Sequence, residues 1–110
     1  MYASSYELSN LCLIIDLNQM QVEGQMGGVL GPVNVYHKWS SFGWNTIEVN
    51  GHDSAELMRG LDAARMHGDG PSCIIAHTIV GRGVPSLEGK FGHNIRLSKE
   101  QAQIALTELQ

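Results

Sequence analysis

The stretch LCLIID, residues 11–16, is an unbroken apolar run that ends in a carboxylate. A run of this kind between polar residues is typical of a strand buried on both faces of a parallel sheet. Further strands are predicted at 44–49 and 72–80, each preceded by a segment with helical apolar spacing. Connections of a dozen or more residues between strands require parallel pairing and right-handed crossovers. The sequence therefore predicts an α/β fold, a parallel sheet of about three strands with flanking helices.

Capping residues mark the predicted helices. Residues 32–43 begin with a proline suited to a first helical turn and end in a glycine. Asp53 with Glu56, and Ser98 with Gln101, have the spacing of capping boxes that open two more helices. These signals predict where the helices between and after the strands begin.

Composition excludes several classes of protein. The chain has 110 residues, enough for one domain, and its 43% hydrophobic and 16% charged content is that of a folded globular protein. A net charge of −4 without a basic stripe argues against nucleic acid as a partner. No apolar run approaches the length of a membrane span, and no signal peptide is recognisable. Cys12 and Cys73 lie in apolar runs, so we expect buried, reduced thiols in the cytoplasm.

Ligands of parallel α/β sheets bind beyond the carboxyl ends of the strands. Here those ends are residues 16–24, 50–53 and 78–83, all rich in polar residues and glycine. Asp16 and Asn18 offer hard oxygen ligands for Mg²⁺ or Ca²⁺, although such residues are also common in turns. The glycines at 81 and 83 and the later His93 could meet a phosphate, although a lone loop histidine is more often merely exposed.

Four segments, in order, resemble the transketolase family: IIDLNQMQVEG at 14–24, KWSSFGWNTIEVNGHD at 38–53, IIAHTIVGRGV at 74–84, and GHNIRLSKE at 92–100. The likeness covers about residues 6–110 and corresponds to the end of the family's thiamine-diphosphate motif and the elements that follow it. The whole chain, 1–110, is expected to be a partial transketolase-type diphosphate-binding domain.

The resemblance implies a function and a site. The parent enzyme would transfer a two-carbon ketol unit between sugar phosphates, with thiamine diphosphate and Mg²⁺ or Ca²⁺ as cofactors, in the cytoplasmic pentose phosphate pathway. Asn18 would bind the metal through its side chain and Met20 through its backbone carbonyl. Val22 would pack near the thiazolium ring. His93 would contact the diphosphate and act as the catalytic residue beside the reacting centre.

The resemblance is incomplete. The family's Gly-Asp-Gly metal motif lies upstream of the asparagine ligand, whereas the Gly-Asp-Gly at 68–70 follows a helix and is expected to be a turn. His93 is followed by Asn94, where the family usually has glycine. We expect partners that supply the missing upstream half of the domain and a pyrimidine-binding subunit, in an oligomer, and an isolated chain without activity. Alternatives are a piece of a deoxyxylulose-phosphate synthase or dihydroxyacetone synthase, or a non-catalytic assembly subunit.

Overall fold

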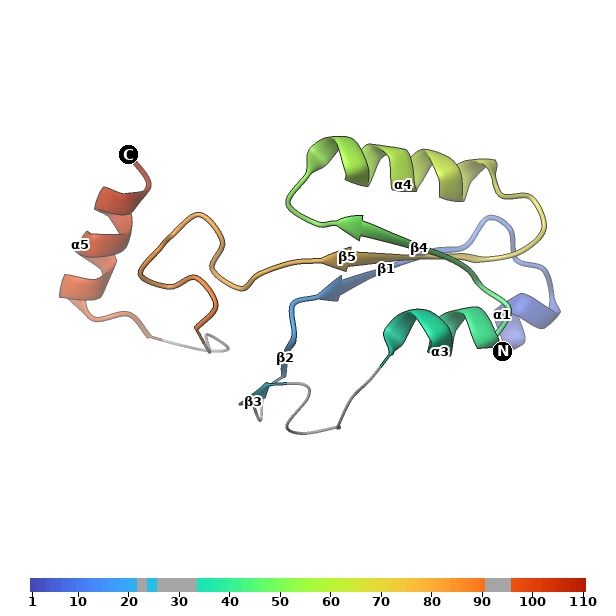
Figure 1. The fold of residues 1–110 in the computed structure, drawn as a ribbon, viewed down its shortest axis with the longest axis horizontal. Coiled ribbons are helices and arrows are strands. Elements are labelled where there is room, and N and C mark those ends of the chain that lie inside the picture. Colours follow the sequence, from blue (N-terminus) through green and yellow to red (C-terminus); the bar gives the residue numbers. More distant parts are fainter. Residues whose placement is uncertain (22–23, 26–33, 91–95) are drawn as a thin grey trace. The chain divides into compact units, whose positions relative to one another are not determined.

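The computed structural model describes residues 1–21, 24–25, 34–90 and 96–110, which fall into two compact units (Figure 1). One unit comprises Met1–Leu17 and Val33–Thr78, and the other comprises Asn18–Pro32 and Ile79–Gln110. The elements of the first unit are α1 (Tyr2–Ser5), β1 (Cys12–Leu17), α3 (Val35–Ser41), β4 (Asn45–Asn50), α4 (Ser54–Met66) and β5 (Ser72–His77). Those of the second are β2 (Met20–Gln21), β3 (Gly24–Gln25) and α5 (Lys99–Glu108).

The first unit is a parallel three-stranded sheet in the order β1-β5-β4. Ile14, Ile74 and Ile47 are paired in register across the three strands. Figure 1 shows α4 over one face of this sheet and α3 over the other. The predicted α/β fold with parallel strands and flanking helices is therefore confirmed.

The core lies where α4 packs against the two strands beneath it. Its buried members are Val49, Ala64, Ile74 and Ala76, with Ile47 and Leu57 packed against them. Gly60 allows the close approach of the helix, because a Cβ there would lie 3.0 Å from the Val49 Cγ1 atom. Burial of these side chains, at about 25 cal/mol per Å² of apolar surface, is what holds α4 to the sheet.

The central strand is β5, and this corrects the prediction for residues 11–16. All residues of β5 except His77 are buried, whereas β1 alternates between exposed and half-buried positions. Ile14 is 55% exposed and Cys12 is exposed, while Cys73 is buried as predicted. The predictions of a doubly buried first strand and a buried Cys12 were wrong because β1 is an edge strand in the described structure, with a neighbour on one side only.

The helix beginning at Ser54 has the predicted cap, but only half of the predicted capping box. The Asp53 carboxylate accepts hydrogen bonds from the backbone N–H groups of Ala55 and Glu56, at 2.8 and 3.1 Å. The Glu56 carboxylate does not return to Asp53 and instead accepts from the backbone N–H of Asn50 at 2.7 Å. This side chain therefore ties the start of α4 to the end of β4.

The other caps were predicted with mixed accuracy. Ser98 and Gln101 form the complete reciprocal box at the start of α5. The helix predicted for 32–43 is α3, whose cap is Asn34; its side chain accepts from the backbone N–H of His37. Pro32 lies outside the described residues. Gly43 follows the helix with φ +78°, a left-handed conformation that favours glycine.

The second unit contains a loop that is stabilised by its own hydrogen bonds and by α5. Residues 80–83 and 85–89 form turns, and the backbone N–H of Gly89 donates to the Val80 carbonyl at 2.8 Å. The Glu108 carboxylate on α5 accepts from both the backbone N–H and the hydroxyl of Ser86, at 3.0 and 2.7 Å. Across the described ranges, no helix has the length and apolar character required to cross a bilayer.

Candidate functional site at the carboxyl ends of the strands

The three strands of the sheet end together. Leu17 of β1 is in register with His77 of β5, which is in register with Asn50 of β4. The chain continues from these ends into Asn18, Thr78 and Gly51, so the sheet brings the starts of the three polar connections to one edge. This edge is where parallel α/β sheets bind ligands.

Asn18 lies directly after β1 and forms a tight turn. Its side-chain oxygen accepts a hydrogen bond from the backbone N–H of Met20 at 2.9 Å, and Met20 then pairs with Gln25 in the small antiparallel sheet. Gln19, between them, has φ +63°, a left-handed conformation that is uncommon for a residue with a side chain. The turn accounts for the geometry of Asn18, and the metal ligation predicted for Asn18 and Met20 stays a prediction.

Thr78 connects the ends of two strands in a way that the sequence did not indicate. Its hydroxyl donates to the Asp16 carboxylate, and its backbone N–H donates to the Leu17 carbonyl at 3.3 Å. Gly51 lies against it, since a Cβ on Gly51 would overlap the Thr78 methyl group. No local sequence signal pairs Asp16 with Thr78, 62 residues apart, because only the register of β1 and β5 brings them together.

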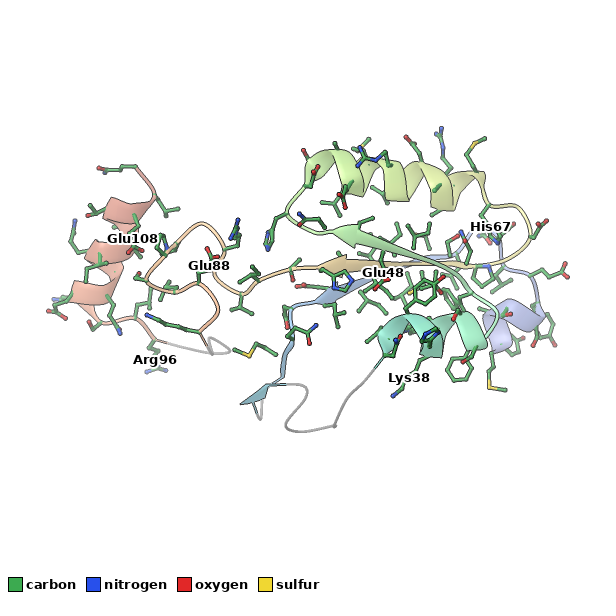
Figure 2. The ribbon with its side chains drawn as sticks, viewed as in Figure 1. Lys38, Glu48, His67, Glu88, Arg96 and Glu108 are labelled. Atoms are coloured by element: carbon green, nitrogen blue, oxygen red, sulfur yellow. The ribbon has the colours of Figure 1, made fainter. Side chains whose placement is uncertain are left out.

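A second pair that the sequence analysis missed joins neighbouring strands. The His77 Nε2 atom lies 2.9 Å from Glu48 Oε1, and both side chains are about half exposed. Figure 2 labels Glu48 on this sheet. An exposed pair of this kind contributes little to stability, about 0–1 kcal/mol.

The glycine-rich turn at 81–83 has an internal structural explanation. Gly81 and Gly83 both have positive φ, at +71° and +93°, and a Cβ on Gly81 would lie 2.7 Å from the Leu87 carbonyl oxygen. The Arg82 guanidinium is paired with Glu88, which Figure 2 labels on the same loop, at 2.6 Å. The fold of the loop therefore requires glycine at 81, and the arginine already has an anionic partner.

The remaining candidate residues provide no further evidence for a metal site or a reactive thiol among the described residues. Val22 and His93, predicted to contact the cofactor, lie outside the described residues. Within the described residues, no three His, Cys, Asp or Glu side chains are grouped closely enough to hold a metal. Burial, with a smaller effect of Cys12, raises the pKa of the Cys73 thiol to about 11, so this thiol is protonated and unreactive at neutral pH.

Comparison with known proteins gives the family. Residues 1–108 match the family described as transketolase, thiamine diphosphate binding domain. The chain belongs to the transketolase family. Its transketolase relatives include the 6-deoxy-6-sulfo-D-fructose transketolase subunit SqwG of Clostridium sp. (strain MSTE9), 32% identical, with 100% of this chain and 40% of that protein covered. Transketolase of Mus musculus is 34% identical over 98% of this chain and 17% of its own length.

Solved transketolases have the same fold. The enzyme of Pichia stipitis in complex with sedoheptulose 7-phosphate superimposes with a TM-score of 0.85 at 23% identity, covering 98% of this chain and 16% of that one. Campylobacter jejuni transketolase gives a TM-score of 0.73 at 31% identity, over 81% of this chain and 14% of that one. The chain thus spans about two fifths or less of the relatives named here.

Proposed function

We propose that this chain supplies part of the diphosphate- and metal-binding site of a thiamine-diphosphate-dependent transketolase. The observation that carries the proposal is the position of Asn18, directly after β1 at the carboxyl edge of a parallel sheet, in a chain of the transketolase family. That edge is the general ligand-binding edge of such sheets. On this proposal, residues 1–110 are a partial diphosphate-binding domain.

The donors on this turn suit a hard divalent cation. The Asn18 amide oxygen and the Met20 backbone carbonyl are neutral oxygen ligands of the kind that Mg²⁺ and Ca²⁺ accept. The Asn18 oxygen already accepts from the Met20 N–H, but a carbonyl oxygen has a second lone pair available for a cation. Among the described residues, no three His, Cys, Asp or Glu side chains are grouped closely enough to hold a metal. On this proposal the remaining ligands belong to the rest of the diphosphate-binding domain.

Two more residues are assigned by resemblance. Val22 would pack against the thiazolium ring, and His93 would donate a hydrogen bond to the diphosphate close to the reacting atoms. Thiamine diphosphate, when bound, supplies the electron sink for breaking and making carbon–carbon bonds, and the protein supplies orientation and electrostatics. The part of this chain would be to hold the cofactor's anionic end and its cation in place.

The proposed reaction is transfer of a two-carbon ketol unit between sugar phosphates. Relatives named as transketolase subunits support it. Among them is one from the apulose-4-phosphate transketolase of Phocaeicola vulgatus, 32% identical over 99% of this chain and 39% of that protein.

Two unpaired cysteines suit a reducing compartment, and we place the activity in the cytoplasm.

The partners would be the remainder of the diphosphate-binding domain and a pyrimidine-binding subunit. The outer edge of β1 is suited to pair with a strand from the remainder of the diphosphate-binding domain. The Leu11 and Leu17 carbonyls accept from the backbone N–H groups of Ser72 and Thr78, at the two ends of β5, so the odd-numbered residues of β1 face β5. In a parallel strand the N–H and C=O groups of alternate residues point to opposite sides. Those of Cys12, Ile14 and Asp16 therefore point outward and can pair with another strand.

The opposite edge of the sheet is partly blocked. On β4 the outward N–H of Asn50 already donates to the Glu56 carboxylate, and charged Glu48 lies on the same strand. Natural proteins protect edge strands against pairing in this way. Next to β1, Cys12 and Leu61 help to line a cavity of about 390 Å³ that an incoming apolar side chain could occupy.

Calorimetric titration of thiamine diphosphate in the presence of Mg²⁺ tests the proposal. We expect no micromolar binding to the isolated chain and Mg²⁺-dependent binding to the chain assembled with the rest of the enzyme. Asn18→Leu, which removes the oxygen ligand, should abolish the Mg²⁺ dependence, whereas Asn18→Asp should retain it. Equal binding by the wild type and Asn18→Leu assemblies would contradict the proposed role. Assembly without any cofactor binding would favour a non-catalytic subunit.

A further inference from the structure

Thr78 lies at a junction between the sheet and the segments that carry the proposed ligands. The first unit ends at Leu17 and again at Thr78. Asn18 and Met20 follow the first of these ends, and the connection that leads to His93 follows the second. Thr78 and the end of β1 are therefore the last residues of the sheet unit before the two segments that carry the proposed ligands.

The side chain and backbone of Thr78 contact the ends of both other strands. The backbone N–H donates to the Leu17 carbonyl at 3.3 Å, and the hydroxyl donates to the Asp16 carboxylate. The methyl group lies over Gly51, whose backbone N–H donates to the His77 carbonyl at 2.8 Å. One residue thus links the ends of β1, β5 and β4.

The hydroxyl-to-carboxylate bond is not needed to set the register of the sheet. Six residue pairs already align β1 with β5 from Cys12↔Ser72 to Leu17↔His77. Asp16 is exposed and Thr78 half-buried, so their bond adds little packing. What the bond adds is a constraint on the last residues of β1, two positions before Asn18.

We propose that Thr78, with Asp16 as its acceptor, is a positioning residue for the metal-binding turn at Asn18–Met20. The inference rests on the proposed function. Loss of the hydroxyl leaves the end of β1 restrained by backbone bonds alone and lets the following turn shift away from the geometry that a cation requires. Threonine is suited to this position because it supplies both a donor for Asp16 and a methyl group against Gly51.

Three variants test the inference in the assembled protein. Thr78→Val keeps the shape and removes the donor, Thr78→Ser keeps the donor, and Ser98→Ala removes a helix cap on α5 and serves as a control for general destabilisation. Mg²⁺ is titrated at a fixed concentration of thiamine diphosphate, binding is followed by calorimetry, and Tm is recorded for each variant. We expect Thr78→Val to raise the Mg²⁺ concentration for half-saturation about tenfold, the lower end of the effect of removing a direct partner of a metal ligand, because Thr78 acts on Asn18 through the end of β1. Thr78→Ser should stay within about twofold of the wild type, because the donor is retained.

Each outcome decides one of the two proposals. If the wild-type assembly shows no Mg²⁺-dependent cofactor binding, the proposed function fails. If the wild type binds and Thr78→Val binds equally well, the positioning role of Thr78 is wrong. It is also wrong if Ser98→Ala, at a similar loss of Tm, weakens Mg²⁺ binding as much as Thr78→Val does. Rescue by Thr78→Ser, with Ser98→Ala unchanged in Mg²⁺ binding, supports it.

Discussion

Replacing Gly51 by alanine tests the packing at the carboxyl edge of the sheet. The new Cβ would lie 3.1 Å from the His77 carbonyl oxygen and 3.2 Å from the Ala76 Cβ, and it would overlap the Thr78 methyl group. The first two contacts are tight but tolerable, whereas the third requires movement. The Thr78 side chain can turn away only by rotating about χ1, which carries its hydroxyl away from Asp16.

The expected magnitude follows from these two effects. Overpacking costs about 1–3 kcal/mol, and loss of the exposed hydrogen bond between Thr78 and Asp16 adds about 0.5–1.5 kcal/mol. A partial shift of the Thr78 side chain would relieve part of the overpacking and keep part of the hydrogen bond. We therefore expect Gly51→Ala to lower the free energy of unfolding by about 2–3 kcal/mol. Gly68→Ala is the matched control, since a Cβ there meets nothing within 4 Å, and its effect should be neutral or stabilising by up to about 1 kcal/mol.

Urea unfolding of five proteins measures the effect: the wild type, Gly51→Ala, Thr78→Ser, the double variant and the Gly68→Ala control. Serine lacks the methyl group that overlaps the new Cβ but keeps the hydroxyl. Most of the cost of Gly51→Ala should therefore disappear in the Thr78→Ser background. A cost that is the same in both backgrounds would refute the packing described for Gly51 and Thr78, and so would a cost no greater than that of Gly68→Ala.

Four other predictions follow from the described residues. A thiol reagent at pH 8 should label Cys12 and leave Cys73 unmodified until the protein unfolds, and labelling of Cys73 in the native state would contradict its burial. Burial raises the pKa of Cys73 from 9.0 to about 11, so between these pH values the folded state keeps a proton that the unfolded state loses. The free energy of unfolding should therefore fall as pH rises from 9 to 11, and it should fall less in Cys73→Ala. Chemical denaturation at each pH measures this. Gln19→Gly should stabilise by about 0.5–1 kcal/mol by relieving the left-handed φ, whereas Gln19→Val should destabilise, and the reverse order of unfolding midpoints would show that the turn is built differently. Ser98→Ala should cost about 1 kcal/mol in thermal unfolding because the backbone N–H of Gln101 loses the Ser98 hydroxyl as its acceptor, and an unchanged Tm would contradict the cap.

The site was only partly predictable, and the reason differs between residues. The position of Asn18 at the end of β1 could be predicted because it comes just after an apolar run, while its role as a metal ligand stays a prediction. Thr78 could not, because its partner Asp16 is 62 residues away and the two meet only through the pairing of β1 with β5. Gly81 illustrates the opposite case, since a glycine that suggested close approach to a phosphate is required by the loop itself, where a Cβ would lie 2.7 Å from the Leu87 carbonyl oxygen.

Local signals in the sequence determined the elements of this protein. Apolar runs set the strands, and the Asp53 and Ser98 side chains set the starts of two helices, because such signals act through neighbours a few residues away. The tertiary structure alone decided that β5 is the central strand, that alternate residues of β1 are exposed, and that Glu56 bonds to Asn50. These features depend on strand order and on contacts between distant segments. An apolar run has the same sequence pattern whether its strand lies at the edge of a sheet or at its centre.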